Sequence, residues 1–533
     1  MKTNLRPAWR PALVMAVLIV VAGAAAFWLT GSRPTQITRQ AADKATRAGR
    51  LARNGTSPFA LLGSPRNVMA TPVQFNTRLN NELPRAPIQT EPDFFPLGVY
   101  YAPTVNRHPT LRGLAFHEAM FKEMRDHNVN TVFGGPGLPG FVAQPELSQL
   151  LDLAARYDLR LIPHLVGFTQ GGRLPIDETT ATQVVRDIVE PVKNHRSLLA
   201  YYIADEPLVK PLANQPDYPQ RIYLMQRLLE GLDPAHPPVV VLGGLDRIEY
   251  YTDLLNPPVF LIDTYPRLPN TQPGDFGRLF STRWDLREYI DLARGNLRDD
   301  RPWWNMLRGY GPRAQRSVVP VEIRAQAAVS LALGAKGLFY FQYLAWTQKG
   351  WYGLQDENFQ PTANYEEVKN VFGRVRKVAP LLLKLHQLEP AATVAATPNN
   401  DTLESVVGTF RGPRNALYLI VANTYLRGDS NVTVYLDSSK VRQTQAFVDE
   451  ENGNRIGLAT RNGKPSVQFN MRPGDFRIFR LDGAREARAL RSWYAMSPDE
   501  QVPTRNKPRG GSRFGSGAAG RAAPGLADAF RIF

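Results

Sequence analysis

Two acidic residues follow an apolar run near residue 200. The string YYIADEP at residues 201–207 places Asp205 and Glu206 directly after a predicted buried strand. A carboxylate loses free energy when it leaves water, so one in this place needs a purpose. Acid catalysis of glycosidic bond cleavage is such a purpose, because a carboxyl group there protonates the leaving oxygen. The alternative is that Asp205 caps the next helix and Glu206 pairs with an arginine.

A third acidic residue, Asp263, ends another apolar run in the string VFLIDTYP at residues 259–266. It could act with Glu206 in catalysis, or it could only hold a hydroxyl group of a ligand. Tyr265 beside it could stack on a sugar or hydrogen-bond to it. Neighbouring residues on a regular strand point to opposite faces. Asp205 and Glu206 can therefore serve one cavity only if their strand breaks its pleat.

Aromatic residues gather at the same run ends. Their faces can stack on sugar rings, although large aromatic side chains also fill protein cores. Trp346 and Tyr101 close their runs and are expected to contact a ligand. Core packing is the expectation for Tyr100, Trp303, Trp304, Tyr343 and Trp351. His164, in IPHLVG, is either a polar contact to a sugar or a buried histidine with a protein partner.

These residues need a repeating framework to bring them together. From residue 93, short apolar runs alternate with helical patterns. The predicted strands are residues 95–101, 130–134, 160–166, 199–204, 239–243, 259–263, 303–307 and 337–343. The predicted helices are residues 114–126, 146–157, 179–194, 220–232, 286–297, 321–333 and 365–388. This α/β pattern predicts a (β/α)8 TIM barrel over residues 93–388, with its active site at the carboxyl ends of the strands.

Beyond residue 388 the pattern changes from helical to alternating. Residues 416–422, 431–436 and 467–481 predict strands of an antiparallel β-sandwich over residues 389–482. Residues 483–533 are rich in Gly, Arg, Ala and Ser and predict a disordered basic tail.

The acidic string resembles a known signature. Asp205-Glu206-Pro207 looks like the Asn-Glu-Pro motif of clan A glycoside hydrolases, which include the family 42 β-galactosidases. The strings LALGAKGLFYF at 331–341 and GLQDENFQPTANYEEVKNV at 353–371 also resemble relatives of these barrels. The resemblance covers residues 94–390 and implies that Glu206 is the general acid/base.

The resemblance has one departure. Clan A enzymes carry a nucleophilic Glu at the end of the seventh strand, where this chain reads PWWNMLRGY at residues 302–310. The nearest acid downstream, Glu322, opens a predicted helix, where a carboxylate favours the helix N-terminus. Other glycosidase barrels place their carboxylates on the fourth and sixth strands. This implies Glu206 as the acid, Asp263 as base or nucleophile, and Asp205 as a sugar ligand.

The spacing of the two carboxyl groups distinguishes the mechanisms. A separation of about 5 to 5.5 Å indicates retention of anomeric configuration, and about 6.5 to 9.5 Å indicates inversion. A much larger gap, or Asp263 turned toward the helices, would favour the alternative function, which is a barrel that binds polysaccharide without hydrolysing it.

The formal charge of +16 lies mostly at the two ends. Residues 1–92 hold 12 basic and 3 acidic residues, and residues 483–533 hold 9 and 4, which leaves a charge of +2 for residues 93–482. A nucleic-acid partner is not expected, because it requires basic residues on the folded domain. The basic ends could hold the protein to an anionic lipid or polymer.

The N-terminus predicts export. Lys2, Arg6 and Arg10 precede an uncharged run at residues 11–29 that is long enough to span a membrane. We expect a signal anchor at residues 1–30, followed by a flexible linker at residues 31–92. The barrel would then lie outside the cytoplasm, in the periplasm or at the cell surface, or be secreted if small residues at 22–26 form a cleavage site.

The remaining motifs restrict the chemistry. The chain has no cysteine, which excludes disulfides, thiolate metal sites and cysteine nucleophiles. It contains no zinc-protease, nucleotide-binding or serine-hydrolase motif in a suitable context, so no cofactor or metal is predicted. The expected partners are a carbohydrate substrate and a membrane. The sugar, the linkage and the oligomeric state stay open.

Overall fold

The computed structural model describes residues 93–102, 114–134, 144–207, 217–243, 257–265, 290, 301–312, 318–346, 350–398 and 405–496. Every described residue lies in one compact unit, within residues 85–533. The predicted anchor, the linker and, apart from residue 290, the helix at 286–297 fall outside the described residues. Across the described ranges, no helix is both long enough and apolar enough to cross a bilayer.

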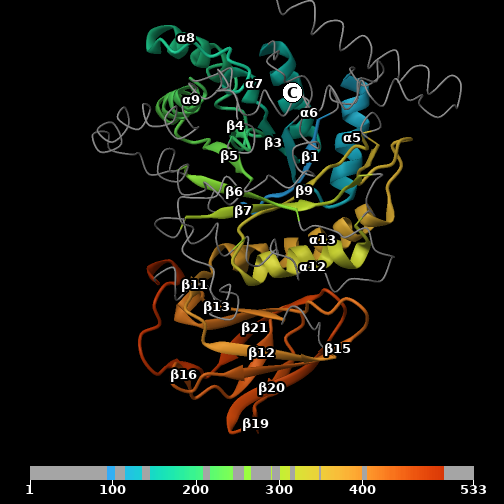
Figure 1. Cartoon of the computed structure of the whole chain (residues 1–533), viewed down its shortest axis with the longest axis vertical. Coiled ribbons are helices and arrows are strands. Elements are labelled where there is room, and N and C mark those ends of the chain that lie inside the picture. The colour runs from blue at the N-terminus through green and yellow to red at the C-terminus, as the bar shows by residue number, and fades with distance from the viewer. Residues whose placement is uncertain are drawn as a thin grey trace, which may run out of the picture. The chain divides into compact units, whose positions relative to one another are not determined.

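One sheet of eight strands forms the centre of the fold (Figure 1). Its strands run parallel in the order β3-β2-β1-β9-β7-β6-β5-β4. They are β1 (Leu97–Tyr101), β2 (Thr131–Gly134), β3 (Arg160–Pro163), β4 (Tyr201–Asp205), β5 (Pro238–Leu242), β6 (Val259–Thr264), β7 (Trp303–Arg308) and β9 (Leu338–Phe341). The amide of Leu161 donates to the Ser197 carbonyl and that of Leu165 to the Tyr202 carbonyl, each at 2.6 Å, so β3 meets β4. The sheet is therefore a closed barrel, and the predicted barrel fold is confirmed.

Helices follow most of these strands in the described part of the chain. They are α5 (Leu114–Asp126), α6 (Gln144–Arg156), α7 (Val166–Thr169), α8 (Glu178–Val189), α9 (Tyr218–Leu232), α12 (Pro320–Ala332) and α13 (Ala363–Leu383). In α5 the buried side chains Met120, Phe121 and Met124 recur at helical spacing, so one face of the helix turns toward the sheet. Nearly every side chain of α12 from Glu322 onward is buried, because this helix is covered on two sides.

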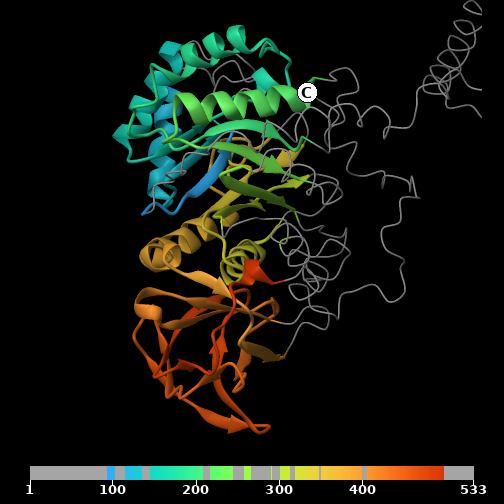
Figure 2. The ribbon, with the colours of Figure 1, turned by 90° about the vertical axis from the view of Figure 1, so that its left-hand side faces the viewer.

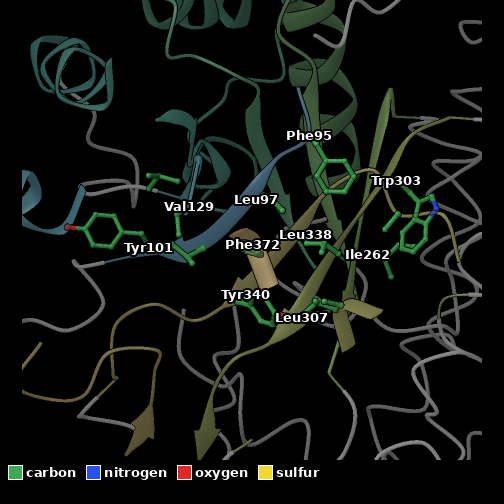
Figure 3. Close-up of a cluster of buried hydrophobic side chains, with 14 of the residues drawn as sticks. Phe95, Leu97, Tyr101, Val129, Ile262, Trp303, Leu307, Leu338, Tyr340 and Phe372 are labelled. Atoms are coloured by element: carbon green, nitrogen blue, oxygen red, sulfur yellow. The ribbon is translucent and has the colours of Figure 1, made fainter. Parts of the chain in front are cut away.

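Successive side chains along the barrel strands point to opposite faces of the sheet and so belong to two separate cores. One core fills the barrel interior, with Tyr202 on β4, Trp304 and Met306 on β7 and Phe339 on β9 among its members. The other lies between the strands and the helices. Figure 3 shows part of this outer core, with Leu97, Tyr101, Leu307, Leu338 and Tyr340 among its labelled residues. Residues two apart on a strand thus share a core, and this parity decides which side chains can reach the mouth of the barrel.

The C-terminal part consists mainly of two antiparallel sheets. The six-stranded sheet contains β11 (His386–Leu388), β13 (Val406–Arg411), β14 (Leu417–Ala422), β21 (Phe476–Asp482), β17 (Ala446–Asp449) and β18 (Arg455–Gly457). The four-stranded sheet contains β12 (Ala392–Thr397), β15 (Ser430–Leu436), β20 (Lys464–Met471) and β19 (Ala459–Arg461). Apolar side chains fill the space between them, with the rings of Phe469 and Phe479 4.8 Å apart. Two short pairs complete the strands: β8 (Gly311–Pro312) with β10 (Trp351–Tyr352), and β16 (Val441–Arg442) with β22 (Arg485–Glu486).

The six-stranded sheet joins the barrel through α12. Phe410, Ile420 and Ile478 on its outer face belong to the same apolar core as Ile323 and Ala328 of the helix. In both views α12 and α13 lie between the barrel strands and the C-terminal sheets (Figure 1, Figure 2). This explains why α12 has almost no polar face.

The predicted disordered tail starts at residue 483, but residues 483–496 are ordered against the C-terminal sheets. Leu490 and Trp493 are buried, and η7 (Trp493–Ala495) follows β22. Arg488 donates to both carboxylate oxygens of Glu389, at 2.7 and 2.8 Å. The Arg-rich composition of this segment concealed two buried apolar side chains and one specific ion pair. Residues from 497 onward lie outside the described residues.

A glycine in β13 tests the contact between sheet and helix. A Cβ atom on Gly408 would lie 1.9 Å from the carbonyl oxygen of Ala332 in α12, so Gly408→Ala must push the two apart. We expect the free energy of unfolding to fall by about 1 to 3 kcal/mol, measured by denaturant unfolding. Gly457→Ala in β18 is the matched control, because a Cβ there meets no atom within 4 Å. Equal stability of the two variants would contradict this contact.

Candidate active site

The end of β4 departs from regular strand geometry. Its register against β5 shifts between Tyr202 and Ala204, and consecutive residues Ile203 and Ala204 both pack into the outer core. Glu206 follows with a backbone φ of 40°, a conformation that residues other than glycine rarely adopt. The strand therefore breaks its pleat, which is the condition under which Asp205 and Glu206 can serve one cavity.

Glu206 and Asp263 meet at the carboxyl ends of β4 and β6. The residues are 6% and 7% exposed, and their carboxyl groups are hydrogen-bonded to each other. Burial raises the pKa of Asp263 well above its usual range, and the charge and hydrogen bond of Glu206 raise it further. Two buried carboxyl groups in contact cannot both ionise easily. The pair therefore keeps a proton at a pH where exposed carboxyl groups have lost theirs, and that proton belongs to the pair.

The two carboxyl groups interact directly, whereas the carboxyl pairs of glycosidases stand about 5 Å or more apart. Asp263 faces Glu206 rather than the helices, so the structure brings the two carboxyl groups together. A reacting group must separate the two carboxyl groups before they can act on it from opposite sides.

Tyrosine hydroxyls surround the carboxyl pair. Tyr202 donates to Oδ1 of Asp205 at 2.5 Å, and Tyr265 is hydrogen-bonded to Asp263. Burial raises the pKa of Tyr202 and Tyr265 well above 10, and it raises the pKa of Tyr310 to about 12. These three phenols therefore stay protonated and act as hydrogen-bond donors. In that form they can orient carboxylates, but they are poor nucleophiles.

A cation stands at the end of β7. Arg308 follows Trp304 and Met306 on the same strand face, and it is 3% exposed. Its Nε donates to the carbonyl of Tyr310 at 3.2 Å, and its guanidinium carbon lies 4.8 Å from the centre of that ring. Gln326 of α12 accepts from the amide of Arg308 at 3.0 Å and donates to its carbonyl at 3.1 Å. The buried Gln326 thus holds the backbone of Arg308 in place.

Tyr101 is not at the mouth of the barrel, which corrects the expectation that it contacts a ligand. It is fully buried in the outer core, and its hydroxyl lies 2.6 Å from Nδ1 of His117. Tyr100 points inward instead and packs 4.9 Å from the Phe341 ring. Burial and the charges of Asp205 and Asp263 raise the pKa of Tyr100, which places it beside the acidic residues. The inward-facing residue is Tyr100, one position before Tyr101.

His164 and Trp346 lie at different depths around the site. The His164 ring packs edge-on against Tyr202, with ring centres 4.8 Å apart, so it stands beside the Tyr202–Asp205 hydrogen bond. Trp346 packs edge-on against Trp351 at 5.3 Å, and Trp351 stacks on Tyr310 at 4.9 Å. The structure therefore connects Trp346 to the site through an aromatic chain.

Glu322 belongs elsewhere, at the start of α12. Its carboxylate accepts a hydrogen bond from the amide of Val319 at 3.0 Å, so it has the helix-terminal role expected from the sequence. In the described part of the chain, no cluster of three or more His, Asp or Glu residues has the arrangement of a metal site.

Sequence reasoning missed two residues of this site. Arg308 could have been predicted from strand alternation, because it follows the inward-facing Met306 by two positions. Gly243, directly after β5, had no signal of its own: a Cβ atom there would lie 2.2 Å from Oε1 of Glu206. The carboxylate of Glu206 occupies the space that any larger residue at position 243 would take.

Replacing Gly243 should therefore displace Glu206. We expect Gly243→Ala to fold but to lower the activity of the site at least about tenfold, since misplacing a reacting group costs large rate factors. Gly231→Ala in α9 is the control, because its Cβ meets no atom within 4 Å and alanine favours a helix. Its activity should be unchanged. A crystal structure of Gly243→Ala with Glu206 unmoved would contradict this explanation.

The raised pKa of Asp263 predicts a dependence of stability on pH. The unfolded chain releases this proton at about pH 4, whereas the folded chain keeps it to higher pH, so the free energy of unfolding falls as pH rises through that window. Asp263→Asn should remove this loss, and its Tm relative to wild type should be higher at pH 7.5 than at pH 4.

Asp177→Asn is the control for that experiment, because hydrogen bonds from Thr180 lower the pKa of the Asp177 carboxyl. The stability from this group is present above about pH 4 and is lost as pH falls through the lowered pKa, which is the opposite sign. If Asp263→Asn and wild type lose stability in parallel with rising pH, the shared proton is refuted.

Comparison with known proteins places the fold but not a family. No family model matches the sequence, and no curated protein matches it. A solved glycoside hydrolase superposes with a TM-score of 0.50 at 11% identity, covering 73% of this chain and 93% of the other. A family 5 glycoside hydrolase from Bacteroides vulgatus gives a TM-score of 0.48 at 11% identity, covering 75% and 92%. The first likeness shows that this chain shares the fold of a glycoside hydrolase.

Proposed function

We propose that this protein is a glycoside hydrolase that cleaves an oligosaccharide or polysaccharide with Glu206 and Asp263. The observation that supports it is the buried, hydrogen-bonded carboxyl pair at the carboxyl ends of β4 and β6. Barrel enzymes carry their active sites at this end of the strands. Two carboxyl groups with one proton supply both the acid and the base that hydrolysis of a glycosidic bond requires.

The proton balance of either stereochemical course suits this pair. In an inverting reaction Glu206 protonates the glycosidic oxygen while Asp263 takes a proton from the attacking water. The proton then returns across the hydrogen bond between them. In a retaining reaction the Asp263 carboxylate attacks the anomeric carbon as Glu206 protonates the leaving oxygen, and Glu206 then deprotonates the water that releases the sugar. The pair holds one proton at the start and at the end of each catalytic cycle.

Neighbouring residues have supporting roles in this proposal. Tyr265 orients Asp263 through its hydrogen bond, and Arg308 lies over the ring of Tyr310, whose pKa the charges of Asp263 and Glu206 raise. Asp205, held by the Tyr202 hydroxyl, is positioned to bind a sugar hydroxyl, with His164 beside it. The likeness of Asp205-Glu206-Pro207 to the clan A motif makes β-galactosides one natural substrate class to test.

A catalytically inactive carbohydrate-binding barrel is the second candidate. It is favoured by Arg308 at the strand end where clan A enzymes carry their nucleophile, and by the direct contact of the two carboxyl groups. In such a protein the aromatic residues around the mouth would bind sugar while the carboxyl groups act only as hydrogen-bond partners.

We also propose that the N-terminus exports and tethers the protein. The uncharged run at residues 11–29 after three basic residues supports this. Fractionation of cells that express the full chain, with a chain beginning at residue 31 as control, tests the proposal. Equal recovery of both chains in the soluble cytoplasmic fraction would refute it.

The catalytic assignment is tested by paired substitutions. Glu206→Gln and Asp263→Asn should each lower kcat/KM about 100-fold or more on a panel of nitrophenyl glycosides and oligosaccharides, since general acid/base catalysis contributes about 100- to 10,000-fold. Glu322→Gln is the matched control, a buried carboxyl on the same barrel that caps a helix. Its activity per folded molecule should equal that of wild type.

Two outcomes would overturn the assignment. Activity unchanged in Glu206→Gln would remove Glu206 from the chemistry. Glycan binding by the wild type with no turnover over long incubation would favour the binding-only candidate. For an active enzyme, proton NMR of the first product anomer decides between retention and inversion.

A further inference from the structure

The irregular end of β4 turns two consecutive carbonyls toward the segment that follows β3. The Tyr202 carbonyl accepts from the Leu165 amide at 2.6 Å, and the Ile203 carbonyl accepts from the buried Thr169 hydroxyl at 2.5 Å. This hydroxyl has one hydrogen, and the Val166 carbonyl is farther from it, at 3.2 Å. Successive carbonyls of a regular strand point to opposite sides, so the two bonds mark the place where the pleat breaks.

The peptide unit between Asp205 and Glu206 is held at both of its polar atoms. Nε2 of Gln170 donates to the Asp205 carbonyl at 2.5 Å. The Glu206 amide donates to the carbonyl of Val241 on β5 at 3.0 Å. The carbonyl and the amide of one peptide unit share a plane, so these two bonds together fix the orientation of that plane. The plane in turn limits the direction in which the Glu206 side chain leaves the backbone.

Gln170 is itself fixed by α9. Its Nε2 also donates to the hydroxyl of Tyr218, the first residue of that helix. Farther along α9, Nε of Arg221 donates to the Leu174 carbonyl at 2.8 Å, and the Leu174 amide donates to the Phe168 carbonyl of α7 at 2.7 Å. An amide nitrogen carries two hydrogens, so one Gln170 side chain can serve both of its acceptors. The chain of bonds connects α9 through α7 to the end of β4.

The φ of 40° at Glu206 requires such support. A residue other than glycine holds this conformation only where the surrounding structure determines it. Without the bond from Gln170, the peptide before Glu206 is free to rotate toward an ordinary strand conformation. The regular pleat would then turn the side chain away from Asp263, and the space beside Gly243 would lose the carboxylate that fills it.

We propose that Gln170 and Thr169, at the C-terminal end of α7, are positioning residues for the carboxyl pair. Gln170 fixes the peptide before Glu206 and so directs that side chain onto Asp263. Thr169 holds the carbonyl of Ile203, where the strand departs from its regular pleat. Their effect on catalysis rests on the proposed hydrolysis, whereas their effect on the contact between the two carboxyl groups does not.

The kinetic test compares Gln170→Met with wild type and with Gln183→Met, all as the full chain. Methionine has a similar length but donates no hydrogen bond. Gln183 is the matched control, because it is exposed on α8 and its Nε2 donates to Asp187 at 2.7 Å. On the nitrophenyl glycoside that the wild type cleaves best, Gln170→Met should lower kcat at least about tenfold and change KM less than about twofold, since misplacing a reacting group affects the transition state more than binding. Gln183→Met should match wild type in both.

Infrared spectroscopy follows the carboxyl pair without a substrate, in difference spectra against Asp263→Asn. The protonated carboxyl band should disappear at a pH at least about one unit lower in Gln170→Met than in wild type, because a displaced Glu206 no longer raises the pKa of Asp263 by its charge and hydrogen bond. A wild type without turnover would refute the proposed hydrolysis, and the band would still decide the role of Gln170. The same band in folded Gln170→Met and wild type would overturn the proposal.

A second pair of variants tests the other positioning residue and does not require Gln170→Met to fold. Thr169→Val keeps the shape of the side chain and removes its donor, whereas Thr169→Ser keeps the hydroxyl. The band should move to lower pH in Thr169→Val and stay at the wild-type pH in Thr169→Ser. Thr182→Val in α8 is the control, because that hydroxyl donates to the Glu178 carbonyl of its own helix at 2.6 Å. Identical bands in Thr169→Val and Thr169→Ser would contradict the positioning role of α7.

Discussion

The contact between two buried carboxyl groups is the constraint on which the site depends. Glu206 and Asp263 come from strands that are not adjacent in the sheet, since β5 lies between β4 and β6. To reach across β5, Glu206 leaves strand geometry with a φ of 40°, and its carboxylate passes over the bare Cα of Gly243. Burial then makes the contact stable only with a proton between the two groups. Backbone strain, a required glycine and a retained proton are three consequences of one contact.

The barrel supplies rigidity on every side of that contact. Asp263 lies near the end of a strand that is paired on both sides, and the backbone of Arg308 exchanges two hydrogen bonds with the side chain of Gln326. Gln326 belongs to α12, which is covered on one side by the barrel and on the other by the six-stranded sheet. The C-terminal sheets thereby support the helix that fixes the cation at the mouth. The two β-rich layers are part of the structure that positions the site, rather than an independent attachment.

The framework was predictable because each barrel strand is a short apolar run followed by helical spacing. All eight predicted strands are present, with ends displaced by a few residues, and the helix at 114–126 has its predicted bounds. Composition gave the wrong prediction at residues 483–496. The segment is rich in arginine, but the buried side chains of Leu490 and Trp493 anchor it.

The site was predictable in its carboxylates but not in its geometry. An acidic residue directly after a buried apolar run costs desolvation free energy, and this identified Asp205, Glu206 and Asp263. Which residue at a strand end points into the barrel depends on bulges and register. Two adjacent aromatic residues do not reveal this, and it is Tyr100, not Tyr101, that points inward. The sequence gives no sign of Gly243, because its importance lies in the space that Glu206 of the neighbouring strand occupies beside it.

The most direct test of the central claim is infrared spectroscopy of the carboxyl groups as a function of pH. A protonated carboxyl absorbs at a carbonyl frequency distinct from that of a carboxylate, and a difference spectrum between wild type and Asp263→Asn isolates the pair. The shared proton predicts a protonated carboxyl band in the wild type that persists above the pH at which exposed carboxyl groups have ionised, about pH 5, and its absence in the variant. A wild-type spectrum with no protonated carboxyl above about pH 5 would contradict the account.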